Sequence, residues 1–182
     1  MKRLKAAFFN RPTLLVAEEL LGKALVFKGH QGIITETEAY MGFDDPASHA
    51  FRGKTPRTKI LFGKAGFSYV YLIYGMYHCL NIVTEKEGFP AAVLIRGIKL
   101  LDKTGLHLNG PGKVCRYLNI NKEQNELNMI TSDELYVACI NQQYSFAKTP
   151  RIGIKVGTEK LWRFLADIDH KPAPPDSARR ID

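Results

Sequence analysis

The chain contains 182 residues, of which 45% are hydrophobic and 24% are charged, as expected for one soluble globular domain with a sizeable core. No apolar run is long enough for a signal peptide or a membrane span, which predicts an intracellular protein without membrane contact. The formal net charge of +8 favours a polyanionic partner such as a nucleic acid, although many basic proteins bind none.

The cysteines give little support for a cross-linked or metal-bound protein. Cys79, Cys115 and Cys139 are odd in number and far apart, and none belongs to a Cys-x-x-Cys pair. This pattern argues against a disulfide framework and against a zinc site. We therefore expect reduced, mostly buried thiols and neither a bound metal nor a cofactor.

The N-terminal part of the chain is predicted to form a helix followed by a β-hairpin. Apolar residues at helical spacing lie between Pro12 and Gly22, which suit the start and the end of a helix. Residues 23–28 and 33–40 have the composition of strands, and Gly29-His30-Gln31-Gly32 predicts the turn between them.

A long loop is predicted next, over residues 41–58, because Gly, Asp, Pro, Ser and basic residues dominate there. Loops of this length in compact domains usually have a function, and His49 lies inside it. Thr55-Pro56 predicts the N-cap and the first residue of a short helix that reaches Phe62.

Residues 67–74, 77–83 and 91–98 are rich in Tyr, Val and Ile and predict three strands. The turn between the first two is tight, so Tyr74 or its neighbour must project away from the sheet. The unbroken apolar run of the third predicts a central strand. Residues 99–110 are predicted to be a connection.

The C-terminal part is predicted to contain a short helix, a loop and two further strands. These lie at residues 110–118, 119–128, 135–140 and 150–156, respectively. The proline-containing tail over residues 169–182 is expected to be frayed. Since no linker or internal repeat interrupts the sequence, residues 1–182 are expected to form one domain.

Two carboxylates, Glu36 and Glu38, lie two residues apart near the end of the predicted strand over residues 33–40. Side chains two apart on a strand share a face, so the like charges repel unless one of them has an unusual environment. A carboxylate with a perturbed pKa is suited to act as a general base. Taken alone, however, this stretch is more typical of a solvated polar face on an edge strand.

Four sequence blocks occur in an order and at a spacing that are specific to one family. They are Thr-Glu-Ala-Tyr (37–40), Asp-Pro-Ala-Ser-His-Ala (45–50), Gly-Lys-Thr-Pro-Arg-Thr (53–58) and Tyr-Val-Tyr-Leu-Ile-Tyr-Gly-Met-Tyr-His-Cys-Leu-Asn-Ile (69–82). Shorter blocks follow at residues 93–96, 110–115 and 151–154. With these blocks the chain, from Pro12 to about Phe164, resembles the alkyladenine (3-methyladenine) DNA glycosylase family.

The resemblance implies a single-domain α+β fold with a curved, mainly antiparallel β-sheet, flanking helices and a protruding β-hairpin. It also implies a DNA glycosylase that flips alkylated or deaminated purines out of duplex DNA and hydrolyses the N-glycosidic bond in base excision repair. Because the matching catalytic block contains no lysine, we expect hydrolysis without Schiff-base strand cleavage. The expected partner is double-stranded DNA with damaged purines, bound by a monomer.

Matching positions imply the roles of individual residues. Glu38 corresponds to the general base and Arg96 to the arginine that positions the attacking water. The remaining matches are the aromatic residues that stack on the flipped base (Tyr40, His49 and Tyr71), the amide that rejects guanine (Asn81) and the minor-groove wedge (Tyr74). Candidate phosphate contacts are Arg57, Lys64 and Arg151, each of which could equally be a solvated surface charge.

Two other functions are compatible with parts of the sequence. A DNA-bending protein would keep the wedge without doing chemistry, but groove insertion alone would not need Glu38, Arg96 and Asn81. An RNA-binding module could use the tyrosines as stacking platforms and would prefer single strands.

Overall fold

The computed structural model describes residues 1–140 and 144–168. In this part of the chain the strands form one sheet, in which β3 is the longest strand and pairs with β2, β6 and β10. The strands are β1 (Lys2–Arg3), β2 (Ala24–Phe27), β3 (His30–Met41), β4 (Ser68–Ile73), β5 (Tyr77–Val83), β6 (Ala91–Leu100), β7 (His107–Asn109), β8 (Leu135–Cys139), β9 (Phe146–Thr149) and β10 (Arg163–Ala166).

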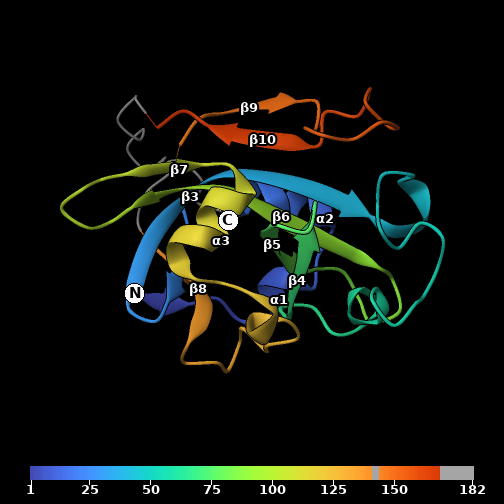
Figure 1. Cartoon of the computed structure of the whole chain (residues 1–182), viewed down its shortest axis with the longest axis horizontal. Coiled ribbons are helices and arrows are strands. Elements are labelled where there is room, and N and C mark those ends of the chain that lie inside the picture. Colours follow the sequence, from blue (N-terminus) through green and yellow to red (C-terminus); the bar gives the residue numbers. More distant parts are fainter. Residues whose placement is uncertain (141–143, 169–182) are drawn as a thin grey trace, which may run out of the picture.

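The order along the sheet is β1-β8-β2-β3-β6-β5-β4, with β7 beside β6 and the β9–β10 pair beside β3. All of these neighbours are antiparallel. Figure 1 shows β3 as a long curved ribbon, with β9 and β10 lying along one of its sides. The predicted α+β class with a curved, mainly antiparallel sheet is therefore confirmed.

Few helices accompany the sheet in the described residues. They are the α-helices α1 (Ala6–Phe9), α2 (Thr13–Leu20) and α3 (Pro111–Leu118) and the 3-10 helices η1 (Gly42–Asp44), η2 (Lys59–Phe62) and η3 (Lys122–Gln124). None of them is long and apolar enough to cross a membrane. The predicted helices at the positions of α2 and α3 are confirmed.

Helix α2 packs on the face of the sheet opposite to Glu36 and Glu38. The hydroxyl of Thr37 on β3 donates a hydrogen bond of 2.8 Å to the carbonyl of Ala17 on α2. Because successive side chains of a strand alternate between faces, the glutamates on either side of Thr37 point the other way. The apolar core under α2 therefore fixes which face of β3 presents its carboxylates.

A close approach between β3 and β6 depends on Gly97. The pairing register of the two strands shifts around Glu36, which marks a β-bulge. A Cβ atom at Gly97 would lie 2.9 Å from Oγ1 of Thr35 and 3.1 Å from Cβ of Glu36. Only glycine leaves room at this position for the bulge that turns Glu36 towards its partners.

The hairpin formed by β4 and β5 projects from the sheet with Tyr74 at its tip, as predicted. Tyr74 and Gly75 both have a positive φ, of 53° and 68°, and Tyr74 is 78% exposed. A left-handed backbone is costly for a bulky residue such as tyrosine. The turn thus holds an aromatic side chain in solvent at some conformational cost.

The predicted strand over residues 150–156 is wrong. The strand in this region is β9, which ends at Thr149. Pro150 cannot donate a ladder hydrogen bond, and Gly153 has a φ of 77°, which is incompatible with an extended strand. Arg151 is also held in the interior by a buried ion pair. The segment forms a loop that reaches back to β3.

Other parts of the prediction are corrected in detail. The connection over residues 99–110 contains the short strand β7, and β1, α1 and β10 were not predicted. The short helix before Phe62 begins at Lys59 rather than at Pro56. Thr55 instead caps a turn, because its hydroxyl accepts a 3.2 Å hydrogen bond from the backbone N–H of Thr58. The tail predicted to be frayed lies outside the described residues.

We predict that Gly97→Ala lowers the free energy of unfolding by about 1–3 kcal/mol, the usual cost of overpacking a buried site. The added methyl group must displace Thr35 or Glu36, both of which are buried. The change is measured as a shift of the midpoint of urea unfolding. Gly29→Asn is the control for loss of a glycine without crowding: no atom lies within 4 Å of its Cβ position, so only the strain of its φ of 85° remains. Asparagine tolerates that region better than other side chains do, so its loss of stability should be smaller. Equal stability of Gly97→Ala and the wild type would contradict this account.

Candidate active site

A cavity of about 240 Å³ opens on the face of the sheet that carries Glu38. Strands β4, β5 and β6 provide its floor, and the loops after β3 and β9 provide two of its walls. The cavity is lined mainly by aromatic and small apolar side chains, with a few polar groups among them. Its lining includes Tyr40, Ala47, His49, Tyr69, Tyr71, Tyr74, Asn81, Arg96, Ile152, Ile154 and Lys155.

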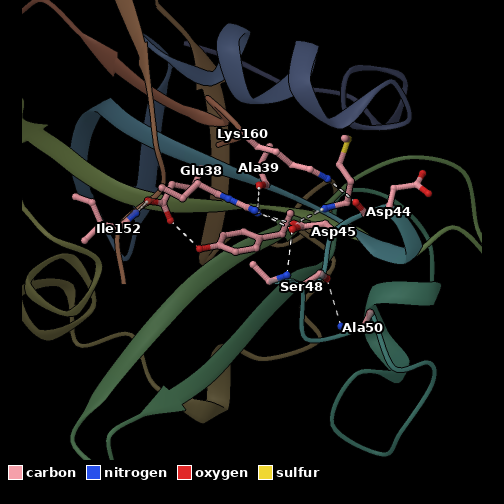
Figure 2. A network of polar contacts seen from close by, with 12 residues as sticks. Glu38, Ala39, Asp44, Asp45, Ser48, Ala50, Ile152 and Lys160 are labelled. Carbon is pink, nitrogen blue, oxygen red and sulfur yellow. Dashed lines mark hydrogen bonds and ion pairs between the residues drawn. The ribbon is translucent and has the colours of Figure 1, made fainter. Parts of the chain in front are cut away.

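Glu38 lies directly behind the cavity wall and is fully buried. Its Oε2 accepts a 2.8 Å hydrogen bond from the hydroxyl of Tyr40, and its Oε1 accepts one of 2.7 Å from the backbone N–H of Ile152 (Figure 2 shows both). Nε of Arg96 lies 3.5 Å from Oε1. The three partners of Glu38 therefore all belong to the cavity lining.

Burial raises the pKa of the Glu38 carboxyl group, because a charged carboxylate loses its hydration in the interior. Arg96, the N–H of Ile152 and the hydroxyl of Tyr40 lower the pKa, and they offset this effect only in part. A carboxylate in this environment accepts a proton more readily than one in water does. This property is what general-base catalysis requires.

Glu36 has a different environment, although it lies only two residues away. Its Oε1 accepts hydrogen bonds from Nε of Arg96, at 3.0 Å, and from Nε of Arg163 on β10, at 2.5 Å. Two guanidinium groups thus compensate Glu36, whereas Glu38 shares only one of them at a longer distance. Glu36 is therefore held by two guanidinium groups, whereas Glu38 has a raised pKa. This difference agrees with the prediction that one of the two glutamates has an unusual environment.

Three rings form the aromatic side of the cavity. The centroids of His49 and Tyr71 are 4.6 Å apart, and those of Tyr69 and Tyr71 are 5.3 Å apart. Nδ1 of His49 lies 3.1 Å from the hydroxyl of Tyr69. Tyr69 was not among the predicted site residues. Its position two residues before Tyr71, on the same face of the strand, was the available signal.

His49 is electrically neutral under ordinary conditions. Burial lowers its pKa to about 4, and the nearby positive charge of Arg57 acts in the same direction. The guanidinium of Arg57 lies 5.3 Å from the centroid of the Tyr71 ring, and the residue is exposed. Arg57 therefore lies at the open side of the aromatic cluster.

Asn81 holds a fixed orientation at the cavity. Its Nδ2 donates hydrogen bonds to the backbone carbonyls of Tyr69 and Cys79, at 3.0 and 3.4 Å. Both contacts engage the donor end of the amide, so Oδ1 is the end that remains for a bound molecule. A fixed acceptor of this kind favours ligands that present a donor and disfavours a differently placed polar group.

The structure separates the three predicted phosphate contacts. Arg57 and Lys64 are exposed, as a phosphate contact requires. Arg151 is buried, and its guanidinium forms a bidentate ion pair with Asp45, with N–O distances of 2.5 and 2.7 Å. The prediction that Arg151 contacts phosphate is therefore wrong, because the side chain is already committed in the interior. Lys155, which was not among the predicted site residues, is an exposed cation of this loop and lines the cavity.

In the part of the chain that the structure describes, no group of three or more His, Cys, Asp or Glu side chains is arranged to hold a metal ion. The three cysteines are free, and Cys79 and Cys115 are buried whereas Cys139 is exposed. The prediction that the thiols are mostly buried is therefore confirmed for two of the three.

We predict that the imidazole of His49 titrates with a midpoint near 4 and that Arg57→Ala raises the midpoint, because it removes a positive charge that disfavours imidazolium. The midpoint should stay below the ordinary value of 6.5, since burial is the larger cause. NMR titration of the His49 ring protons measures both effects. Lys64→Ala, which removes another exposed cation, serves as the control and should leave the midpoint unchanged. A midpoint above 6.5 in the wild-type protein would contradict a neutral His49.

Comparison with known proteins agrees with the geometry of this site. The family described as methylpurine-DNA glycosylase (MPG) matches residues 7–170. A relative from Sodalis glossinidius is 62% identical over 161 residues, which cover 88% of this chain and 95% of the relative. One from Rickettsia felis is 57% identical over 171 residues, 93% of this chain and 97% of the relative, and both are named as 3-methyladenine DNA glycosylases. With nearly its whole length matched, the chain belongs to the methylpurine-DNA glycosylase family.

Proposed function

We propose that this protein is a monofunctional DNA glycosylase that flips alkylated or deaminated purines out of duplex DNA and hydrolyses their N-glycosidic bond in base excision repair. The observation that carries the proposal is the position of Glu38, a buried carboxylate with a raised pKa immediately behind an aromatic cavity. An enzyme that acts on one base of a duplex needs such a pocket, because the reacting atoms are inaccessible within the base stack.

The aromatic cluster suits a planar and cationic base. Alkylation at N3 or N7 gives a purine a positive charge, and a cation stacked on an electron-rich ring gains roughly 0.5–2 kcal/mol over a neutral one. Tyr40, His49 and Tyr71 supply rings at the cavity. Because the pKa of His49 is lowered to about 4, its ring is neutral and does not repel the cation. We extend the stacking role to Tyr69.

In the proposed reaction, the ionised carboxylate of Glu38 takes a proton from a water molecule while the water oxygen bonds to the sugar C1′. The bond between C1′ and the base nitrogen breaks, and its electron pair leaves with the base. A cationic purine then leaves as a neutral molecule. The charge of Glu38 also favours the oxocarbenium character of the sugar, and Arg96, 3.5 Å from the same carboxylate, is placed to orient the water.

Asn81 is proposed to discriminate among bases. Its amide is fixed by two backbone carbonyls, so it cannot turn to suit every purine. The exocyclic amine of guanine would project towards a side chain that cannot move aside, so the proposed rejection is steric and does not depend on donor–acceptor matching. This arrangement supports the rejection of normal guanine.

The proposed DNA-binding surface includes the hairpin tip beside the cavity. Tyr74, at the tip of the β4–β5 hairpin, also lines the cavity, which suits a wedge that fills the gap left by the flipped base. Arg57 and Lys64 are proposed phosphate contacts. The partner is double-stranded DNA with a damaged purine, bound by a monomer.

The absence of lyase activity is also part of the proposal. Schiff-base chemistry needs an amine at the sugar C1′, and the hydrogen-bond and ion-pair partners of Glu38 are Tyr40, Arg96 and the backbone of Ile152. The lysine of the cavity lining, Lys155, is exposed. Borohydride trapping of a covalent complex at Lys155 would contradict this part of the proposal.

We predict that Glu38→Gln binds a lesion-containing duplex nearly as well as the wild type does but excises the base at least ~10²-fold more slowly, as expected for a lost general base. The measurement is single-turnover release from duplexes that each contain one lesion, namely 3-methyladenine, 7-methylguanine, hypoxanthine or ethenoadenine. Glu19→Gln, on the exposed side of α2, is the control. Comparable excision by the mutant would move the catalytic role to another residue, with Glu36 as the first candidate.

We predict that Tyr74→Ala weakens binding of a lesion duplex by roughly 10-fold or more and slows base flipping, since the side chain offsets part of the unstacking cost. A single-stranded substrate with the same lesion should be less affected, because it needs no wedge. Fluorescence of a base analogue beside the lesion reports flipping directly. Tyr117→Ala, an exposed tyrosine of α3, is the control. Equal losses on single-stranded and duplex substrates would assign Tyr74 a role other than the wedge.

A further inference from the structure

The ion pair between Asp45 and Arg151 has no role in the reaction described above, yet both side chains are fully buried. Buried ion pairs contribute little to stability relative to apolar residues, because both groups lose their hydration. Nε of Arg151 is also buried without a hydrogen-bond partner, which adds a further cost. This pair is therefore poorly explained as a device for stability alone.

We propose that Asp45 and Arg151 are positioning residues that hold two walls of the cavity in place and set the backbone donor that faces Glu38. The proposal rests on the proposed function of Glu38 as the general base. The two residues act through other groups and need not touch the substrate.

The first connection runs from Arg151 to Glu38. The guanidinium of Arg151 donates a 3.0 Å hydrogen bond to the carbonyl of Ala39 on β3, in addition to its two bonds to Asp45. This anchors the loop to β3 immediately beside Glu38. The next residue, Ile152, can then direct its N–H at Oε1 of Glu38 with a distance of 2.7 Å (Figure 2).

The second connection runs from Asp45 to the loop that carries His49. Oδ1 of Asp45 accepts a hydrogen bond from the N–H of Ala47, at 3.2 Å, and Oδ2 accepts one from the N–H of Met41, at 3.3 Å. One carboxylate therefore organises the start of the loop while it pairs with the arginine. Ala47 and His49 both line the cavity.

The guanidinium also has close contacts with aromatic rings. Its Cζ lies 4.7 Å from the ring centroid of Tyr40 and 5.1 Å from that of Trp162. Tyr40 in turn donates to Glu38, so Arg151 supports two of the three partners of the general base. The backbone at Gly157 closes over the pair, since a Cβ there would lie 3.3 Å from Nη2 of Arg151.

Lysine cannot reproduce this arrangement, because it has one ammonium group in place of a planar fork. In Arg151→Lys the loop should therefore lose its fixed distance from β3, and the N–H of Ile152 should bind Glu38 less well. That N–H favours the ionised carboxylate, so its weakening should raise the pH at which Glu38 ionises. The other titratable or charged groups around Glu38 are Glu36 and Tyr40 on β3, Tyr71 on β4, Cys79 on β5, Arg96 on β6 and Arg163 on β10. The substitution leaves all of them in place.

The test measures the ionisation of Glu38 and excision in parallel. Protein labelled with ¹³C at the glutamate carboxyl groups is titrated by NMR, and the Glu38 signal is assigned by its absence in Glu38→Gln. In Arg151→Lys the Glu38 midpoint should rise by about one pH unit, the scale of one weakened hydrogen bond to a charged group. The acidic limb of the pH profile for 7-methylguanine excision should move by the same amount.

Asp45→Glu, which keeps the negative charge but lengthens the side chain by one methylene group, is measured alongside and should shift the midpoint in the same direction, because the longer side chain cannot keep the same contacts with Arg151, Ala47 and Met41. Arg11→Lys is the matched control, because Arg11 forms a bidentate pair with Glu19 on the surface, with N–O distances of 3.2 and 2.7 Å. It should change neither the midpoint nor the profile.

The two hypotheses fail in different ways. If the wild-type protein excises the lesion but neither Arg151→Lys nor Asp45→Glu moves the Glu38 midpoint or the acidic limb, the positioning role is overturned and the proposed function stands. If the midpoint shifts as expected while the wild type releases no base from any lesion, the positioning role stands and the proposed function falls.

Discussion

The structure depends on the compensation of one buried carboxylate, that of Glu38. A carboxylate removed from water must receive hydrogen bonds from the protein or take up a proton. Two hydrogen-bond donors, the hydroxyl of Tyr40 on the same strand and the backbone N–H of Ile152, and an ion pair with Arg96 on β6 compensate Glu38 from three separate parts of the chain. The site is therefore complete only when the sheet and the loop after β9 have both reached their final positions.

Glu36, the neighbouring carboxylate, explains why Arg96 offsets the cost of burying the charge of Glu38 only in part. Arg96 lies closer to Glu36, at 3.0 Å, than to Glu38, at 3.5 Å, and Arg163 adds a second positive charge beside Glu36. Glu36 thus fixes Arg96 between the two carboxylates and limits its effect on Glu38. As a result, the ionised form of Glu38 is accessible without being strongly stabilised, which is the balance that a general base needs.

Features that depend on neighbours in the sequence could be predicted. The β2–β3 and β4–β5 hairpins, helix α3 and the projection of Tyr74 all follow from alternation, turn residues and capping signals within a few positions. The family motifs also predicted five site residues that all line one cavity, namely Tyr40, His49, Tyr71, Asn81 and Arg96.

Features that depend on distant partners could not be predicted. Arg151 resembles a surface cation in the sequence, because Asp45 lies 106 positions away. The alternating apolar residues Ile152, Ile154 and Val156 predicted a strand, but Ile152 and Ile154 line the cavity and Val156 is exposed. A pattern of this kind cannot distinguish a side chain that packs in a sheet from one that forms the wall of a pocket.

The pairing of β3 with three other strands, β2, β6 and β10, determines how this part of the molecule unfolds locally. Glu38 lies between β6 and β10, so its backbone is inside the sheet, and amide hydrogens there should exchange with solvent only when the sheet itself unfolds. The tip of the β4–β5 hairpin has exposed side chains and should exchange through local fraying. The proposed general base and the proposed DNA wedge would thus lie in regions of very different local stability. Glu38 belongs to a protected strand that holds its position, whereas Tyr74 belongs to a hairpin tip that can adjust to the DNA.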